Sequence, residues 1–130
     1  MATETSNALA DKHVLIVEDE PLVAMEFASN LAGAGAHVVG RCATVREALA
    51  VLKASDDRSP IDAAVVDFVL ADRNSEPLQR ALKQRHIPFV VVSAYPRPLV
   101  RTEVSEHILQ KPVSAEALCS KLRDACRRAA

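Results

Sequence analysis

Acidic side chains directly follow two apolar stretches of the chain. Glu18 and Asp19 come after the apolar run 13–17, and Asp67 comes after the apolar run 63–66. Converging carboxylates repel one another unless a cation neutralises them, and their hard oxygen atoms favour Mg²⁺, or Mn²⁺, with several waters retained. An acidic stretch after a strand can also be the solvated start of a helix. If the fold joins these carboxylates, we expect a divalent cation between them.

A hydroxyl group and an ammonium group follow two further apolar runs. Ser93 comes after the run 88–92, and Lys111 comes after the run 107–110. A hydroxyl donor and a positive charge suit the oxygens of a phosphoryl group. Taken singly, each residue has a structural explanation, as a satisfied hydroxyl or a surface charge. Together with an aspartate nucleophile and a cation, they predict a phosphoryl-binding site.

The apolar runs alternate with segments of helical periodicity. We predict strands at 13–17, 37–42, 63–66, 88–92 and 107–110, and helices at 20–34, from Thr44 onward, at 75–85, near Pro98 and after Ser114. Thr44 and Glu47 are spaced as a capping box, and Ser114 can cap the last helix.

This alternation predicts right-handed crossovers and a parallel sheet covered on both faces. We expect an α/β, flavodoxin-like, doubly wound (βα)5 fold, with a five-stranded parallel sheet in the order 2-1-3-4-5. In such a fold the functional crevice lies at the carboxyl ends of the strands. The acids, Ser93 and Lys111 all follow strand ends, so they are expected at this one edge.

Five positions, each at the end of its own strand, resemble a known family. Glu18-Asp19, Asp67, Ser93 and Lys111-Pro112, in this order, resemble the CheY-like receiver domain of bacterial response regulators. The resemblance spans roughly residues 12 to 128.

The resemblance implies a role for each acidic residue. Asp67 would be the phosphoacceptor. Asp19 and Asp67 would bind Mg²⁺ together with the main-chain carbonyl of Val69, and Glu18 would help through a bound water. These roles make the domain a catalyst of its own phosphorylation and dephosphorylation only, and not an enzyme acting on other substrates.

The resemblance also covers the basic side of the site. Ser93 and Lys111 would hold the phosphoryl oxygens, and the peptide bond between Lys111 and Pro112 would be cis. An X-Pro bond prefers trans by only about 0.5–1 kcal/mol, so the cis form is physically accessible.

The segment 88–95, Pro-Phe-Val-Val-Val-Ser-Ala-Tyr, is similar to a mostly single-domain subgroup of receivers with a PF-x-x-x-T-G-Y pattern. Ser93 and Ala94 depart from the Thr and Gly of that pattern. Most receivers have an aromatic switch residue three positions before the lysine, but this chain has Ile108 there. Tyr95 is therefore the candidate substitute for the switch.

The composition argues against several classes of protein. Sixteen basic and 17 acidic residues give a net charge of −1, which disfavours nucleic-acid binding, and no apolar run approaches the roughly 18 residues of a membrane span. The three cysteines (Cys42, Cys119 and Cys126) suggest neither a zinc site nor a disulfide framework, which fits a reducing cytoplasm. The four histidines (His13, His37, His86 and His107) are assigned no function.

The chain is expected to hold a flexible tail over 1–11, a receiver domain over 12–128 and no output domain, because only 19 residues follow Lys111. We predict a cytoplasmic response regulator, a monomer or weak homodimer. It would take a phosphoryl group from a sensor histidine kinase or a histidine phosphotransfer protein and signal to a downstream protein, or act as a phosphate sink. Bulky Val69 and Tyr95 predict slow self-dephosphorylation.

Two other functions fit parts of the pattern. An adaptor could keep the fold and ignore phosphate, and Ile108 favours this mildly. An aspartate-based phosphohydrolase also uses a Mg²⁺-bound aspartate after a strand. It normally needs a second aspartate two residues later, where this chain has Val69.

Overall fold

In the computed structural model, which describes residues 9–95 and 107–129, five strands and four helices follow one another along the chain. They are β1 (His13–Val17), α2 (Pro21–Gly33), β2 (His37–Cys42), α3 (Val45–Ala54), β3 (Ala63–Asp67), α4 (Glu76–Gln84), β4 (Phe89–Ser93), β5 (Ile108–Gln110) and α5 (Ala115–Ala129). These bounds agree with the predicted elements to within one or two residues at most ends. The helix predicted near Pro98 lies outside the described residues.

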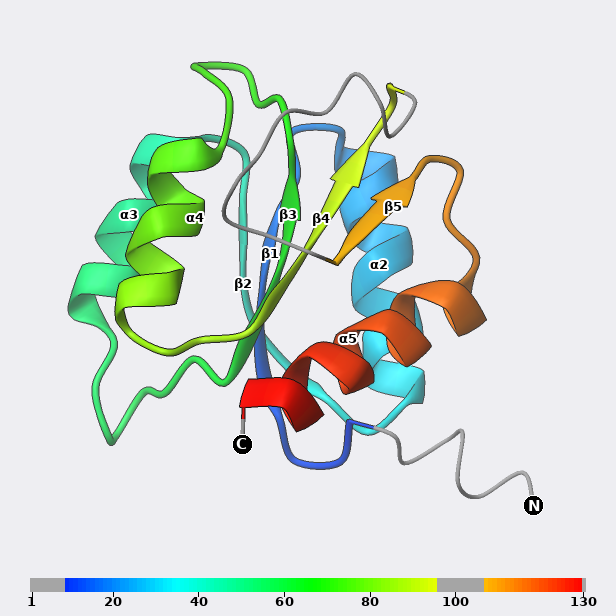
Figure 1. The fold of residues 1–130 in the computed structure, drawn as a ribbon, viewed down its shortest axis with the longest axis horizontal. Coiled ribbons are helices and arrows are strands. Elements are labelled where there is room, and N and C mark those ends of the chain that lie inside the picture. The colour runs from blue at the N-terminus through cyan, green and yellow to red at the C-terminus, as the bar shows by residue number, and fades with distance from the viewer. Residues whose placement is uncertain (1–8, 96–106, 130) are drawn as a thin grey trace.

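All five strands are parallel and form one sheet in the order β2-β1-β3-β4-β5. Helices α3 and α4 cover one face of the sheet, and α2 and α5 cover the other (Figure 1). The predicted flavodoxin-like order is therefore confirmed, and the carboxyl ends of the strands meet at the top of the molecule in this view.

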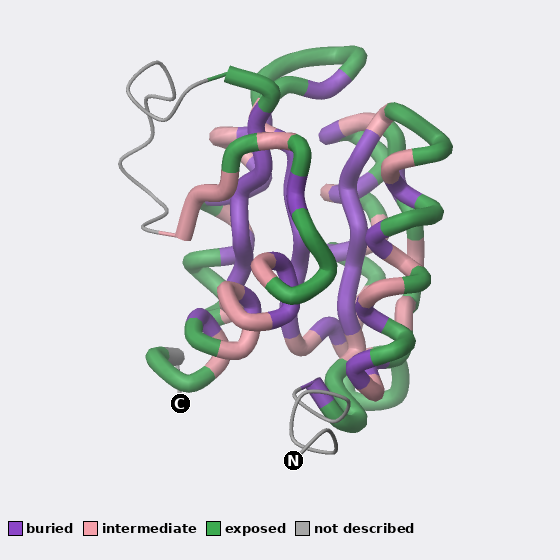
Figure 2. Tube along the Cα trace, turned by 90° about the vertical axis from the view of Figure 1, so that its right-hand side faces the viewer, coloured by how far each residue is buried: buried purple, intermediate pink, exposed green. Residues whose placement is uncertain are grey.

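Alternating strand residues supply a separate core on each side of the sheet. In β1, Val14 and Ile16 pack with α2 and α5, whereas Leu15 and Val17 pack with α3 and α4. The central strands are buried along nearly their whole length (Figure 2). Burial on both faces explains why these strands appear in the sequence as continuous apolar runs.

Two helices begin with the predicted side-chain caps. The Thr44 hydroxyl accepts a hydrogen bond from the backbone N–H of Glu47 at 3.0 Å, and Ser114 Oγ accepts one from Ala117 N–H at 3.0 Å. The Glu47 carboxylate accepts from the Thr44 hydroxyl at 3.2 Å. The first hydrogen bond of the predicted capping box, from Glu47 N–H to the Thr44 hydroxyl, is therefore present. The Glu47 carboxylate contacts the Thr44 side chain.

The prediction that the tail extends to residue 11 was wrong for its last three residues. Leu9 is buried among the core residues beside α2 and α5. Its N–H donates to the Ala34 carbonyl, and the N–H of Asp11 donates to the Gly35 carbonyl, each at 3.1 Å. Because an apolar side chain is buried here and the backbone is hydrogen-bonded, the folded domain includes Leu9.

Among the described residues, no helix combines the length and the apolar character that a membrane span requires.

Candidate functional site

The register of the sheet brings the three predicted carboxylates to one edge. Val17 pairs with Val66, so the next residues, Glu18 after β1 and Asp67 at the end of β3, lie at the same level of the sheet. One carboxylate oxygen from each of Glu18, Asp19 and Asp67 lies within 4.8 Å of the other two. A set of hard oxygen donors this close fits a Mg²⁺ ion that keeps several of its waters.

Two of these acids are buried. Glu18 is 4% exposed and Asp67 is 6% exposed, whereas Asp19 is partly exposed. Burial raises the pKa of Glu18 from its ordinary 4.5 to about 7, and the nearby Asp67 carboxylate adds to this, against the opposing effect of Lys111. The backbone N–H of Glu20 donates to Glu18 Oε2 at 3.0 Å and so orients the carboxyl group.

Lys111 reaches into the acidic cluster from the end of β5. Its Nζ lies 2.7 Å from Glu18 Oε1, 3.0 Å from Asp67 Oδ2 and 3.6 Å from Glu20 Oε1. Burial alone lowers the pKa of Lys111, but the contacts with Glu18 and Asp67 outweigh it and raise the pKa above the ordinary value. The ammonium group therefore stays charged beside the acids. The peptide bond between Lys111 and Pro112 is cis.

Ser93 is 1% exposed at the end of β4. Its hydroxyl accepts a hydrogen bond from the N–H of Tyr95 at 3.0 Å, and its carbonyl accepts one from the N–H of Lys111 at 2.7 Å. Ser93 is thus tied by its backbone to the lysine and by its side chain to the start of the segment that follows β4.

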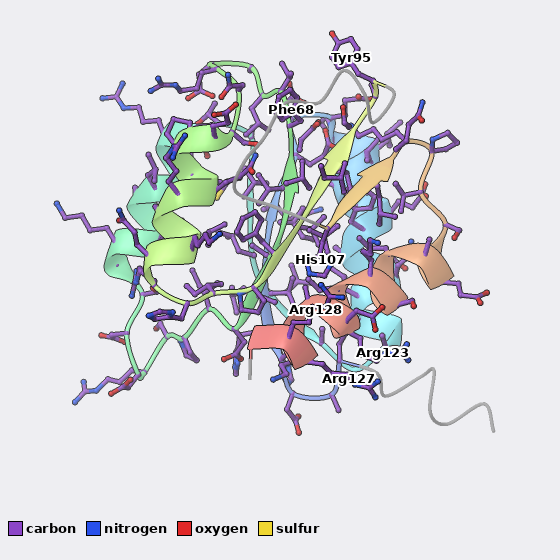
Figure 3. The ribbon with its side chains drawn as sticks, in the orientation of Figure 1. Phe68, Tyr95, His107, Arg123, Arg127 and Arg128 are labelled. Carbon is purple, nitrogen blue, oxygen red and sulfur yellow. The ribbon has the colours of Figure 1, made fainter. Side chains whose placement is uncertain are left out.

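The two bulky residues expected to flank the site are exposed. Val69 is 44% exposed and Tyr95 is 52% exposed. Figure 3 shows Tyr95 at the upper end of β4, with its ring extending away from the sheet. Ile108 instead packs against the core cluster beside α3 and α4. The exposed aromatic ring near the site therefore belongs to Tyr95.

Asp72, five residues after Asp67, makes a contact that the sequence did not predict. It lies in the connection from β3 to α4, and its carboxylate accepts hydrogen bonds from the N–H groups of Val45 and Arg46 at 3.0 and 3.1 Å. Val45 lies 27 residues before Asp72 in the sequence. The sequence does not indicate this contact, because nothing about an acid in a polar loop shows which distant residue it will contact.

Comparisons with known proteins place this geometry in context. The chain matches no protein-family model. It is 33% identical over 103 residues to the phyllosphere-induced regulator PhyR of Methylorubrum extorquens, covering 76% of this chain and 38% of that protein. The chain therefore spans well under half the length of this curated relative.

Two solved structures match the chain over nearly their whole length. SdrG from Sphingomonas melonis Fr1 is 34% identical with a TM-score of 0.75, and the match covers 92% of this chain and 98% of SdrG. The receiver (REC) domain of the PhyR response regulator from Erythrobacter litoralis is 27% identical with a TM-score of 0.69, covering 94% of this chain and 92% of that domain. With its sheet order and the acids at its carboxyl edge, the chain belongs to the receiver-domain family of response regulators.

Proposed function

We propose that this protein is a response regulator of a two-component phosphorelay, which accepts a phosphoryl group onto Asp67 from a phosphohistidine in a sensor kinase or a phosphotransfer protein. One observation carries the proposal. The carboxylate oxygens of Glu18, Asp19 and Asp67 lie within 4.8 Å of one another, and Lys111 Nζ lies 3.0 Å from Asp67. A nucleophile, a candidate metal site and a positive charge thus occupy one edge of the sheet.

The transfer step uses groups of the site, the phosphohistidine donor and a Mg²⁺ ion from solution. A carboxylate oxygen of Asp67 attacks the phosphorus atom, an O–P bond forms, and the P–N bond to the donor imidazole breaks with its electron pair returning to nitrogen. Lys111 offers a fixed positive charge to the phosphoryl oxygens, and Ser93 offers a hydroxyl. Mg²⁺ held by Asp19, Asp67 and the Val69 carbonyl, with Glu18 nearby, would neutralise charge that builds up during transfer.

Exposed apolar side chains around the site support a protein donor. The large hydrophobic residues exposed in the described part of the chain are Leu22, Met25, Val39, Val69 and Tyr95. Four of them follow strands that end at the edge carrying Asp67, each within eight residues of the strand end: Leu22 and Met25 follow β1, Val69 follows β3 and Tyr95 follows β4. Exposed apolar side chains that follow the strand ends at a charged edge favour contact with another macromolecule over contact with a small phosphodonor alone.

A phosphoryl group on Asp67 would act on the exposed Tyr95 through Ser93. Phosphorylation adds about 1.5 to 2 negative charges beside Ser93, whose hydroxyl now accepts from Tyr95 N–H. A hydroxyl that turns to donate to a phosphoryl oxygen changes this contact and biases the position of Tyr95. We propose that a downstream protein reads the change at this edge, with use as a phosphate sink as the alternative output.

The proposal is tested by incubating the protein with Mg²⁺ and acetyl phosphate or phosphoramidate. We expect a mass gain of one phosphoryl group that disappears in Asp67→Asn. Asp57→Asn is the matched control, because it makes the same change at an exposed position of the loop before β3. If the wild type gains no mass and binds no Mg²⁺, the proposal is wrong and a phosphate-independent adaptor takes its place.

A further inference from the structure

The side chain of Asp72 joins the connection between β3 and α4 to the start of another helix, α3. Asp72 Oδ1 accepts a hydrogen bond from Val45 N–H at 3.0 Å, and Oδ2 accepts one from Arg46 N–H at 3.1 Å. These N–H groups lie in the first turn of α3, where backbone donors have no partner inside the helix. A carboxylate at this end of a helix is also favoured by the helix dipole.

The N-terminus of α3 already has a capping residue, Thr44, so the contact with Asp72 does more than cap this helix. Thr44 satisfies the N–H of Glu47, which is a different donor from the two that Asp72 takes. The hydrogen bond from the N–H of Val45 is the largest influence that lowers the pKa of Asp72 below its ordinary value, as expected for a contact that favours the charged carboxylate. The contact therefore joins two segments that are far apart in sequence by two charge-assisted hydrogen bonds.

The turn held by Asp72 directly follows Asp67, the proposed phosphoacceptor at the end of β3. After Asp67 the chain folds back on itself, with a bridge between Val69 and Asn74 and with Ser75 N–H donating to the Phe68 carbonyl at 2.8 Å. Asp72 lies within the turn closed by the hydrogen bond from Leu70 N–H to the Arg73 carbonyl at 3.0 Å. The turn rises at the top of Figure 1 near the start of α3. The turn is thus fixed at its base by β3, by the buried side chain of Leu70 in the core cluster that includes α3, and by the polar contact of Asp72 with α3.

We propose that Asp72 is a positioning residue that holds the turn 68–75 on α3, so that the Val69 main chain is kept in place for the cation beside Asp67. This inference rests on the proposed function. The contact and the cation order the same turn, so each strengthens the other. By linkage, Mg²⁺ stabilises the contact by the same factor by which the contact improves Mg²⁺ affinity.

Asp72→Ala, Asp72→Asn and Thr44→Ala test the role of Asp72. We expect Asp72→Ala to weaken Mg²⁺ binding about fivefold, an effect of the size that loss of a capping side chain produces, and Asp72→Asn to weaken it less. Thr44→Ala removes a cap from the same helix without touching the turn. It should lower the free energy of unfolding but change the Mg²⁺ dissociation constant less than about twofold.

Hydrogen exchange gives a readout independent of phosphorylation. Mg²⁺ should slow exchange of the Val45 and Arg46 amides in the wild type and in Thr44→Ala, but not in Asp72→Ala. The inference is wrong if wild type and both Asp72 variants bind Mg²⁺ equally well, or if Thr44→Ala weakens binding as much as Asp72→Ala. A wild type that neither binds Mg²⁺ nor accepts a phosphoryl group would instead overturn the proposed function, and the inference with it.

Discussion

The Nζ atom of Lys111 lies 2.7 Å from the Oε1 atom of Glu18, closer than to the carboxylate of Asp67 at 3.0 Å. The side chain of Glu18 is fully buried, so this ammonium group is its main source of compensating charge. Without a bound cation, the lysine shares its charge between the two acids. If the site binds Mg²⁺ or a phosphoryl group as proposed, this ion pair has to break or rearrange.

The pKa of Glu18 predicts a pH-dependent stability. Its folded-state pKa, about 7, exceeds its ordinary value of 4.5, so the folded protein binds a proton more tightly than the unfolded chain does. Without divalent cations, the free energy of unfolding should fall as pH rises from about 4.5 to about 7. The depressed pKa values of Asp62 and Asp72 act below this range, and Lys111 stays charged throughout it.

Urea denaturation at several pH values measures this effect. Glu18→Gln should remove most of the slope, whereas Glu20→Gln should keep it, because the Glu20 side chain is 66% exposed. Saturating Mg²⁺ should also flatten the slope in the wild type, since it favours the ionised carboxyl group. A wild-type slope that survives in Glu18→Gln would show that another group is responsible.

Lys111→Met separates cation binding from phosphorylation. Removing a positive charge next to three carboxylates should tighten Mg²⁺ binding, because the cation no longer competes with the ammonium group. Phosphorylation by acetyl phosphate at saturating Mg²⁺ should slow by about 10²-fold, since a fixed charge for the phosphoryl oxygens is lost. Lys83→Met, at an exposed position of α4, should change neither quantity. If Lys111→Met lost Mg²⁺ binding and phosphorylation to the same extent, the result would point to misfolding of the site.

The sheet and the residues at its carboxyl edge could be predicted because their signals are local. Strands buried on both faces appear as apolar runs, and polar residues such as Asp67 and Ser93 mark where the runs end. The strand order then followed from general rules for crossover connections. These signals sufficed to bring the acids, the hydroxyl and the lysine to one place.

Contacts between distant segments could not be predicted in this way. Leu9 lies between two alanines in a short stretch with no strand or helix pattern, yet it packs into the core beside α2 and α5. Asp72 is one of several acids in polar connections, and only the fold brings it to α3. Lys111 was expected to serve the phosphoryl group, but its closest acidic contact is Glu18, which depends on side-chain packing at the strand ends.

Gly35 should be needed for the turn that follows α2. Its φ of +95° is unfavourable for residues with a side chain, and an added Cβ would lie 3.1 Å from the Ala10 backbone. Gly35→Ala should lower the free energy of unfolding by about 1–2 kcal/mol. Gly33→Ala is the matched control: an added Cβ meets no other atom within 4 Å, and alanine favours the helix by up to about 1 kcal/mol. Equal stability of the two variants in urea denaturation would contradict the prediction.

Val69 should make the phosphorylated protein long-lived. Hydrolysis of the acyl phosphate needs a water molecule in line with Asp67, and the side chain two residues later is apolar and cannot orient one. Val69→Asn supplies a hydrogen-bonding group and should speed loss of the phosphoryl group on the order of tenfold. Val39→Asn, at a similarly exposed valine of β2, should leave the rate unchanged. Decay of the phosphorylated protein after removal of acetyl phosphate, followed by mass, measures both rates. A wild-type half-life of seconds that does not change in Val69→Asn would show that this side chain does not limit access of water.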